Sequence, residues 1–500
     1  MLDRRDFLLR SGGLLAALGA SCPVAADDCL GATIGDASLK RFLGSLDGTC
    51  VLPADPSYPA ARLLYNLRFD SRPSLIVRPS SIDDIRRTVD FARDASVHLA
   101  IRSGGHSYIG ASGSEGIVLD LSSMGGVQPL GGSMFRIAGG TQLQRVYGDL
   151  RCNGNWTLPC GSCDTVGFGG IAQGGGFGYL QRAHGLTCDR VRAATVVLAD
   201  GSVVQAAPEA DGDLLWALRG GGGGSFGVAV DFTVEAVPFA PLQVILWYWP
   251  LDAADEALAL MHDAAADGRL PRHASAGVIF NRPAAALATP QCIGLLWSRS
   301  SMADAMAARS MLTGPGGIPA TPGLGYSYQA DSPACDPTAV ATREHYRAKS
   351  SMVYGAPTPG TGAAIRSWML ARVASPVLSA ADYATINFLT LGGAVSDLAP
   401  DATAFPHRDA RLEVQYLAYV QSPNPRSIEA NRAWIRGAYA DVAPRLANGG
   451  SGGYCNYADE DLTAAQYPAH YWGANYPRLQ ATKRRVDPGG FFRGKQTVRG

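Results

Sequence analysis

A histidine and a cysteine, each set among glycines, are the residues of this chain best suited to covalent chemistry. His106 lies in Arg102-Ser-Gly-Gly-His106-Ser-Tyr108, and Cys163 lies in Cys160-Gly-Ser-Cys163-Asp-Thr-Val-Gly167. Paired glycines destabilise a helix and favour tight turns, so His106 is expected in a turn at the end of the apolar strand 97–101. Backbone N–H groups in such a turn form an anion nest, which commonly holds a ligand phosphate.

The glycine-rich stretch 168–178 follows Cys163 closely. It has too many glycines for a helix or a regular sheet, and it would let the backbone approach a large, flat ligand. A flexible surface loop with an incidental cysteine explains the composition equally well.

The order of these motifs resembles that of the berberine bridge enzyme-like flavoproteins, which belong to the vanillyl alcohol oxidase/p-cresol methylhydroxylase superfamily. The resemblance covers about residues 60–235 and 400–495. It implies FAD bonded through its 8α-methyl group to His106 and through C6 to Cys163. It also places further residues around the FAD, namely Arg102, Ser103, Gly104, Gly105, Ser107, Val166, Gly167, Gly170, Gly174, Gly175, Gly227, Val228, Tyr454 and Asn456.

The length of 500 residues favours two domains over one. The resemblance implies an α+β, two-domain fold of the vanillyl alcohol oxidase type, with an FAD-binding domain and an antiparallel-sheet substrate domain. The predicted division is an export signal at 1–26, the first part of the FAD-binding domain at 27–236, the substrate-binding domain at 237–447 and a return to the FAD-binding domain at 448–500.

Local patterns predict the elements that would position these residues. Ser81 is typical of a helix N-cap, and apolar residues at helical spacing follow it. Further strands are expected at 75–77, 116–121, 191–198 and 202–205, and helices at 142–150 and 213–218. Beyond residue 241, strands at 244–249, 274–280 and 293–297 alternate with helices at 253–264 and 303–312, which indicates an α+β domain. Residues 313–345 are expected to be loops.

Gly222-x-Gly224-x-x-Gly227 matches a Rossmann dinucleotide fingerprint. That fingerprint requires a helix after the glycines. The residues that follow, 228–234, alternate as a strand, so a Rossmann site is not predicted here.

The charge balance excludes some partners. With 43 basic and 43 acidic residues the formal net charge is zero, which argues against nucleic acid or an anionic membrane as the main partner. A small-molecule substrate, with O2 as the second partner, fits better, and we expect a monomer without stable membrane insertion.

The N-terminus and the cysteines indicate an exported protein. Arg4-Arg5 before a short apolar run resembles a twin-arginine signal, so a periplasmic or extracellular location is predicted. A lipoprotein signal ending at Cys22 is the alternative. The other cysteines could form disulfides, with Cys29–Cys50 as the first candidate pair. No spacing predicts a metal site.

The strand-like segment 411–419 places Glu413 and Gln415 on one face. That face could simply be a solvated sheet surface. The family resemblance instead implies that both side chains point at the substrate over the flavin. Gln415 stands where the enzyme that names the family has a glutamate base.

Tyr457 lies in Asn456-Tyr457-Ala-Asp459, which resembles the family signature whose tyrosine faces the flavin. A phenol has a pKa near 10, too high for a base at neutral pH, unless a carboxylate accepts its proton. Glu413 is the natural partner, because carbohydrate oxidases of the family pair a tyrosine with a carboxylate. The alternative is a structural tyrosine whose hydroxyl caps a loop.

By the same resemblance Tyr108 and Phe177 line the substrate pocket, and Tyr108 joins Tyr457, Glu413 and Gln415 as a catalytic residue. Plant monolignol oxidases have tyrosine where Phe177 stands. Val166 occupies the position associated with oxygen access and hence with oxidase activity.

The leading hypothesis is a secreted oxidase that converts the anomeric hydroxyl of a sugar or oligosaccharide to a lactone and reduces O2 to H2O2. An oxidase of aromatic or secondary-metabolite alcohols is the second hypothesis. A flavoprotein with a purely structural FAD is the third. The middle of the chain carries no motif that separates the first two.

Overall fold

The computed structural model describes residues 36–282, 289–313, 321–328, 343–379, 381–421, 423–447 and 451–500. The predicted export signal at 1–26 lies outside these residues. Cys29 does too, so its predicted pairing with Cys50 stays a prediction. The boundaries predicted at 236 and 447 stay predictions.

The first sheet has the strand order β1 (Thr49–Val51), β2 (Leu75–Arg78), β4 (Ile117–Asp120), β3 (Leu99–Arg102). Strands β2, β4 and β3 are parallel, and β1 pairs antiparallel with β2. Helix α4 (Ile82–Asp94) is capped as predicted, because the Asp84 N–H donates to Ser81 Oγ at 3.1 Å. The chain leaves β3 directly into the turn that carries His106.

The second sheet is antiparallel and has the order β5 (Val127–Gly131), β6 (Met134–Ala138), β10 (Val228–Glu235), β8 (Val191–Val197), β9 (Val203–Ala206). Strand β10 follows the glycines at 222–227, so the exclusion of a Rossmann site is confirmed. The neighbouring elements are α2 (Asp36–Ser45), α3 (Tyr58–Ala61), η2 (Leu121–Met124), α5 (Leu143–Cys152), β7 (Trp156–Thr157), α7 (Gln181–His184), η3 (Thr187–Arg190), α8 (Gly212–Leu218) and β11 (Val237–Pro238).

The prediction that 168–178 forms no helix is wrong for its first half, because α6 spans Phe168–Gly174. Glycine is needed there for close packing. A Cβ at Gly169 would lie 2.7 Å from the carbonyl oxygen of Gly139, which no larger residue tolerates. The propensity cost of glycine in this short helix is outweighed by its tertiary contact with β6.

The third sheet is antiparallel and has seven strands in the order β15 (Thr321–Tyr328), β12 (Leu242–Trp249), β14 (Gln291–Ser298), β13 (Ala274–Arg282), β17 (Ala384–Thr390), β18 (Leu412–Tyr419), β16 (Tyr346–Val353). Strand β15 contradicts the loop predicted for 313–345, since it pairs with β12. Trp247 and Trp249 are buried in the core of this part and therefore do not bind ligand.

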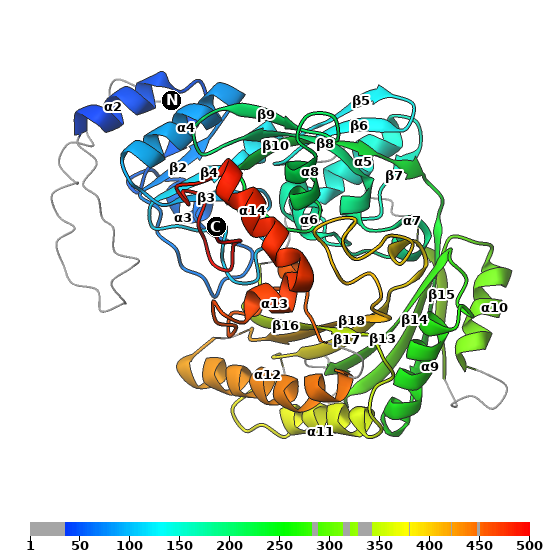
Figure 1. Cartoon of the computed structure of the whole chain (residues 1–500). Coiled ribbons are helices and arrows are strands. Elements are labelled where there is room, and N and C mark those ends of the chain that lie inside the picture. The colour runs from blue at the N-terminus through cyan, green and yellow to red at the C-terminus, as the bar shows by residue number, and fades with distance from the viewer. Residues whose placement is uncertain are drawn as a thin grey trace.

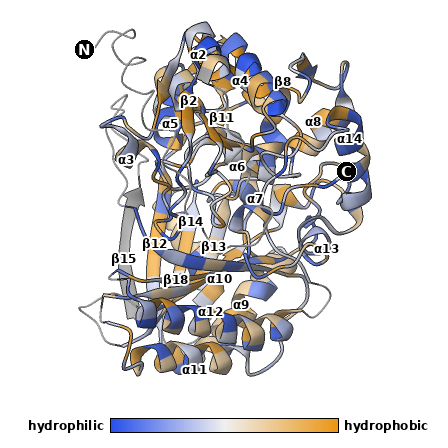
Figure 2. Cartoon of the chain, turned by 90° about the vertical axis from the view of Figure 1, so that its left-hand side faces the viewer, coloured by the Kyte–Doolittle hydropathy of each residue, from blue (hydrophilic) through white to orange (hydrophobic). Residues whose placement is uncertain are grey.

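A layer of helices covers one face of the seven-stranded sheet, as Figure 1 shows. They are α9 (Ala254–Ala266), α10 (Met302–Thr313), α11 (Thr361–Val373) and α12 (Pro425–Leu446). In Figure 2, both hydrophilic and hydrophobic residues occur along α11 and α12. The other face of the sheet is turned toward the two smaller sheets.

The C-terminal residues return to the N-terminal half of the chain (Figure 1). After η6 (Cys455–Tyr457), α13 (Tyr467–Trp472) and η7 (Gly473–Asn475), helix α14 (Tyr476–Val486) packs against α8. Lys483 of α14 is buried, and its ammonium donates to Asp487 Oδ2 at 2.6 Å and to the carbonyl of Phe492. It also donates to the carbonyl of Ser225, which anchors the glycine run 220–224.

Candidate active site

A cavity of about 470 Å³ lies between the glycine-rich turns and the helix-free face of the seven-stranded sheet. The β3 turn and the start of α6 form one wall, and β17 and β18 form another. It gathers most of the residues that the sequence assigned to a site. These are Ser103, Gly104, Gly105, His106, Ser107, Tyr108, Cys163, Val166, Gly167, Gly170, Phe177, Gly227, Glu413, Gln415, Tyr454, Asn456 and Tyr457.

His106 is held by a hydrogen bond and by a stacked ring. Its Nε2 lies 2.8 Å from Thr165 Oγ1, and the Tyr65 ring stacks on it with centroids 4.0 Å apart. Burial lowers the pKa of the imidazole to about 4, so the ring is neutral at physiological pH. Among the described residues Nδ1 has no hydrogen-bond partner, so this nitrogen is left for bonding to a ligand.

Cys163 also borders the cavity. Its side chain is open to the cavity but otherwise enclosed by protein. This enclosure, followed by the negative charges of Asp164 and Glu344, raises the pKa of the thiol. A protonated thiol is less nucleophilic than a thiolate, so reaction here depends on an electrophile held in place.

Bare glycine backbone forms a cradle whose shape fits a large cofactor. Side chains at Gly170 and at Gly224, which has φ +76°, would meet no protein atom within 4 Å, although both residues border the cavity. In contrast, a Cβ at Gly104 would lie 2.2 Å from the backbone nitrogen of Gly167, so the two turns touch through backbone alone. The open space beside this glycine backbone fits a large cofactor such as FAD.

Four residues assigned to FAD from the sequence do not border the cavity: Arg102, Gly174, Gly175 and Val228. They support its wall from behind. The buried Arg102 guanidinium donates to the carbonyl of Ala61 at 2.6 Å and so braces the histidine turn. A Cβ at Gly174 would lie 2.2 Å from the side-chain oxygen of Asn456, and Val228 is buried between the two smaller sheets.

Strand β18 presents Glu413 and Gln415 to the cavity, whereas Val414 and Tyr416 face the core under the helices. The predicted alternation is confirmed, and the alternative of a solvated sheet surface is wrong. Gln415 Nε2 donates to the Tyr108 hydroxyl at 2.5 Å. The rings of Tyr108 and Tyr457 stack with centroids 5.2 Å apart, so β18 and the C-terminal segment meet at one point.

Glu413 is an unusual carboxyl group, being 3% exposed with no hydrogen-bond partner for Oε1 among the described residues. Burial raises its pKa to about 8. The pKa of Tyr457 is also raised well above its usual value, first by burial and then by the charge of Glu413. Both groups are therefore protonated near neutral pH, and Glu413 ionises first as the pH rises.

The sequence reasoning missed several residues of the site. Asn387 of β17 lies opposite Gln415 and donates to its Oε1 at 3.4 Å. Trp297 of β14 stacks on Tyr179 with centroids 4.2 Å apart, and both border the cavity. Alternation along 384–390 could have indicated Asn387, but only pairing across the sheet brings these side chains together.

In the described part of the chain no group of three or more His, Cys, Asp or Glu side chains could hold a metal ion. None of the described helices is long and apolar enough to cross a membrane.

Two family models match the chain: "FAD binding domain" over residues 73–207 and "Berberine and berberine like" over residues 453–499. Among relatives, the glucooligosaccharide oxidase of Sarocladium strictum is 31% identical over 86% of this chain and 87% of its own length. Berberine bridge enzyme-like 18 of Arabidopsis thaliana is 27% identical over 89% and 88%.

A solved structure of glucooligosaccharide oxidase from Acremonium strictum, which carries 6-S-cysteinyl, 8α-N1-histidyl FAD, superposes with a TM-score of 0.81. It is 24% identical and covers 92% of this chain and 99% of its own. The likeness in fold extends through both halves of the molecule. The chain belongs to the berberine bridge enzyme-like family of the vanillyl alcohol oxidase/p-cresol methylhydroxylase superfamily and is an FAD-dependent oxidase.

Proposed function

We propose that this protein is an exported oxidase that holds FAD through His106 and Cys163 and oxidises the anomeric hydroxyl of a sugar or oligosaccharide to a lactone. The observation that carries the proposal is the placement of Tyr457 and Glu413 on the same cavity as the glycine cradle, with Glu413 Oε1 unpaired among the described residues. The 31% identity to a glucooligosaccharide oxidase over most of both chains supports the substrate class.

His106 and Cys163 are the proposed covalent anchors. The hydrogen bond between Thr165 Oγ1 and Nε2 of His106 leaves Nδ1 for the bond to the 8α-methyl group. Cys163 would bond C6. The glucooligosaccharide oxidase of the same fold carries one cysteinyl and one histidyl link of this kind.

The side chains facing the cavity can move the substrate proton. Bound FAD supplies a hydride acceptor and a route for two electrons to O2, which becomes H2O2. The substrate hydroxyl gives its proton to the Tyr457 oxygen, while the Tyr457 proton passes to the Glu413 carboxylate. A carboxylate whose pKa is about 8 accepts a phenol proton far more readily than an ordinary one, because its pKa lies closer to that of the phenol.

Gln415 and Asn387 provide the polar groups that orient a sugar. The Gln415 amide is fixed by Tyr108, and the buried Asn387 Oδ1 has no partner among the described residues. Such an acceptor favours a ligand that donates a hydrogen bond, as sugar hydroxyls do.

The test is anaerobic reduction of the flavin by cellobiose, maltose, glucose and vanillyl alcohol. Bleaching by the sugars, with H2O2 formed when air is readmitted, supports the proposal, and Tyr457→Phe should slow it by about 10² to 10⁴-fold. Bleaching by vanillyl alcohol alone would contradict the sugar assignment. Flavin that no donor reduces would favour a structural role.

The second candidate, oxidation of aromatic alcohols, is favoured by the stacked pair Tyr179 and Trp297 on the cavity wall. Trp297→Ala separates the two candidates when both donor types reduce the flavin. If the aromatic wall recognises the substrate, this variant should slow flavin reduction by vanillyl alcohol more than flavin reduction by glucose.

Export is proposed from the leader. Replacing Arg4-Arg5 with two lysines should retain the folded, flavin-loaded protein in the cytoplasm if the twin-arginine route carries it. Unchanged export would refute that route.

A further inference from the structure

A C-terminal strap, residues 451–461, crosses the open edge of the seven-stranded sheet. Strand β16 is the last strand of that sheet, so one of its backbone edges has no neighbouring strand. The strap covers it, with the Met352 N–H donating to the carbonyl of Gly452 at 2.9 Å. Tyr457 and Asp459 lie on this strap only two residues apart.

The strap contacts both faces of the sheet. Ser350 of β16 pairs with Gln415, which faces the cavity, whereas Lys349 pairs with Tyr416, which faces the helices. Because neighbouring side chains of a strand point to opposite faces, Ser350 contacts the strap on the cavity face of the sheet and Lys349 contacts it on the helix face.

On the cavity side, Ser350 fixes the turn that carries the catalytic tyrosine. Its hydroxyl accepts the Tyr454 N–H at 2.9 Å and donates to the Tyr457 carbonyl at 3.3 Å. The Tyr457 N–H in turn donates to the Tyr454 carbonyl at 2.8 Å. The backbone of the turn is therefore held at both ends by one hydroxyl.

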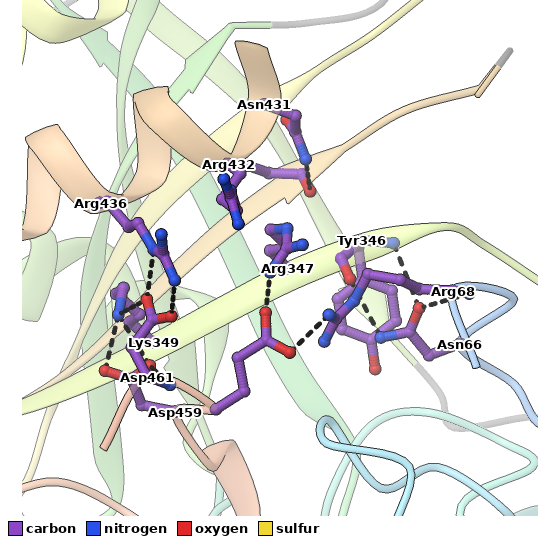
Figure 3. Close-up of polar contacts among 12 residues, drawn as sticks. Asn66, Arg68, Tyr346, Arg347, Lys349, Asn431, Arg432, Arg436, Asp459 and Asp461 are labelled. Atoms are coloured by element: carbon purple, nitrogen blue, oxygen red, sulfur yellow. Dashed lines mark hydrogen bonds and ion pairs between the residues drawn. The ribbon is translucent and has the colours of Figure 1, made fainter. Parts of the chain in front are cut away.

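On the helix side, a buried ion cluster locks the strap (Figure 3). The Lys349 ammonium contacts both Asp459 oxygens and one Asp461 oxygen, each at 2.7 Å. The side chains of Lys349 and Asp459 are only 5% and 3% exposed. Arg436 of α12 donates to Asp461 at 2.9 Å through Nε.

The remaining acidic residue of the strap is also paired. Glu460 forms ion pairs with Arg347 of β16 and with Arg68. Every carboxylate at 459–461 thus meets a cation from outside the strap, and the cations come from three separate segments.

A contribution to the free energy of unfolding does not by itself explain why these charges are buried. A buried ion pair gains little net stability, because desolvation of the charges offsets their attraction, but it defines one arrangement sharply. The arrangement that this cluster defines is the position of the strap, and Tyr457 is the strap residue that enters the cavity.

We propose that Lys349 is a positioning residue for the oxidation, which acts through Asp459 to hold Tyr457 at its place in the cavity although Lys349 itself lies on the opposite face of the sheet. This inference rests on the proposed role of Tyr457 as the base. Misplacement of a reacting group by about 1 Å can lower a rate about 10²-fold, so loss of the lock should affect the chemical step rather than substrate binding.

The test compares Lys349→Met, Lys349→Arg and the wild-type holoenzyme in anaerobic flavin reduction by cellobiose, or by the member of the donor panel that reduces the wild type fastest. Lys349→Met should lower the limiting rate about 10²-fold with KM nearly unchanged. Lys349→Arg, which keeps the charge, should restore most of the rate. An unchanged rate in Lys349→Met would overturn the proposal.

A second comparison separates positioning from general damage. In a Tyr457→Phe background, Lys349→Met should cause no further loss, because the group that it positions is already absent. An equal additional loss would refute the proposal. If Tyr457→Phe itself retained the wild-type rate, the proposed base would be wrong, which is a different failure.

Two further variants control for folding. Ile365→Ala in α11 leaves a cavity in the core between the helices and the seven-stranded sheet. This variant should have a lower melting temperature and an unchanged rate of flavin reduction. Lys349→Met combined with Asp459→Asn removes both buried charges and so avoids an unpaired one. It should fold and still reduce slowly, and a wild-type rate in this double variant would overturn the proposal.

Discussion

The carboxyl group of Glu413 makes the stability of this protein depend on pH in an uncommon direction. Burial raises its pKa from an ordinary value of 4.5 to about 8. Between these values the folded protein keeps a proton that the unfolded chain releases, so the free energy of unfolding falls as the pH rises. Most buried carboxylates, which are ion-paired, act in the opposite direction.

The size of the effect follows from the pKa difference. Each pH unit is worth about 1.36 kcal/mol, so an ionised Glu413 lowers the free energy of unfolding by about 5 kcal/mol at pH 9. At pH 5 the cost is below about 1 kcal/mol. Glu413→Gln keeps the shape of the side chain but cannot ionise, so the variant lacks this loss.

The assay is thermal or urea unfolding of wild type and Glu413→Gln at pH 5, 7 and 9, with flavin content matched. The free energy of unfolding of Glu413→Gln should exceed that of the wild type only slightly at pH 5, and by about 5 kcal/mol at pH 9. Glu256→Gln, an exposed change in α9, should follow the wild type. Parallel curves for wild type and Glu413→Gln would show that Glu413 ionises near its ordinary pKa.

Further predictions concern the rate, the cofactor and the core. The kcat/KM of the wild type should rise about tenfold per pH unit below pH 8 and level off above it, and Glu413→Gln should remove this rise, as steady-state kinetics would show. Mass spectrometry should find one covalent flavin link in His106→Ala or Cys163→Ala and none in the double variant. Gly170→Val should lower flavin content but not the melting temperature of flavin-free protein, since its side chain would enter the cavity. The buried guanidinium of Arg408 forms an ion pair with the buried carboxylate of Asp189. Arg408→Met should lower the free energy of unfolding in urea by about 3–5 kcal/mol, because it leaves the Asp189 carboxylate without this partner.

Short-range chemistry made much of this molecule predictable. The alternation in 411–419 identified which side chains of β18 share one face. Alternation is set by neighbouring residues, so local sequence carries that information. The glycine pattern around His106 left a flexible loop equally open, and the family resemblance was needed to indicate a cofactor site there. The glycine-rich helix α6 was not predicted from local sequence, because its conformation is set by contact with Gly139.

The sequence by itself determined the family, the residues suited to hold FAD and the tyrosine and carboxyl suited to proton transfer. Only the tertiary structure decided that Glu413 has a raised pKa and an oxygen with no hydrogen-bond partner in the part of the chain that the structure describes, because burial depends on everything packed around a side chain. It also decided that Lys349 meets Asp459, 110 residues away, across the edge of a sheet. The spacing of residues along the chain does not predict that contact, because the contact forms only when β16 and the C-terminal strap lie side by side.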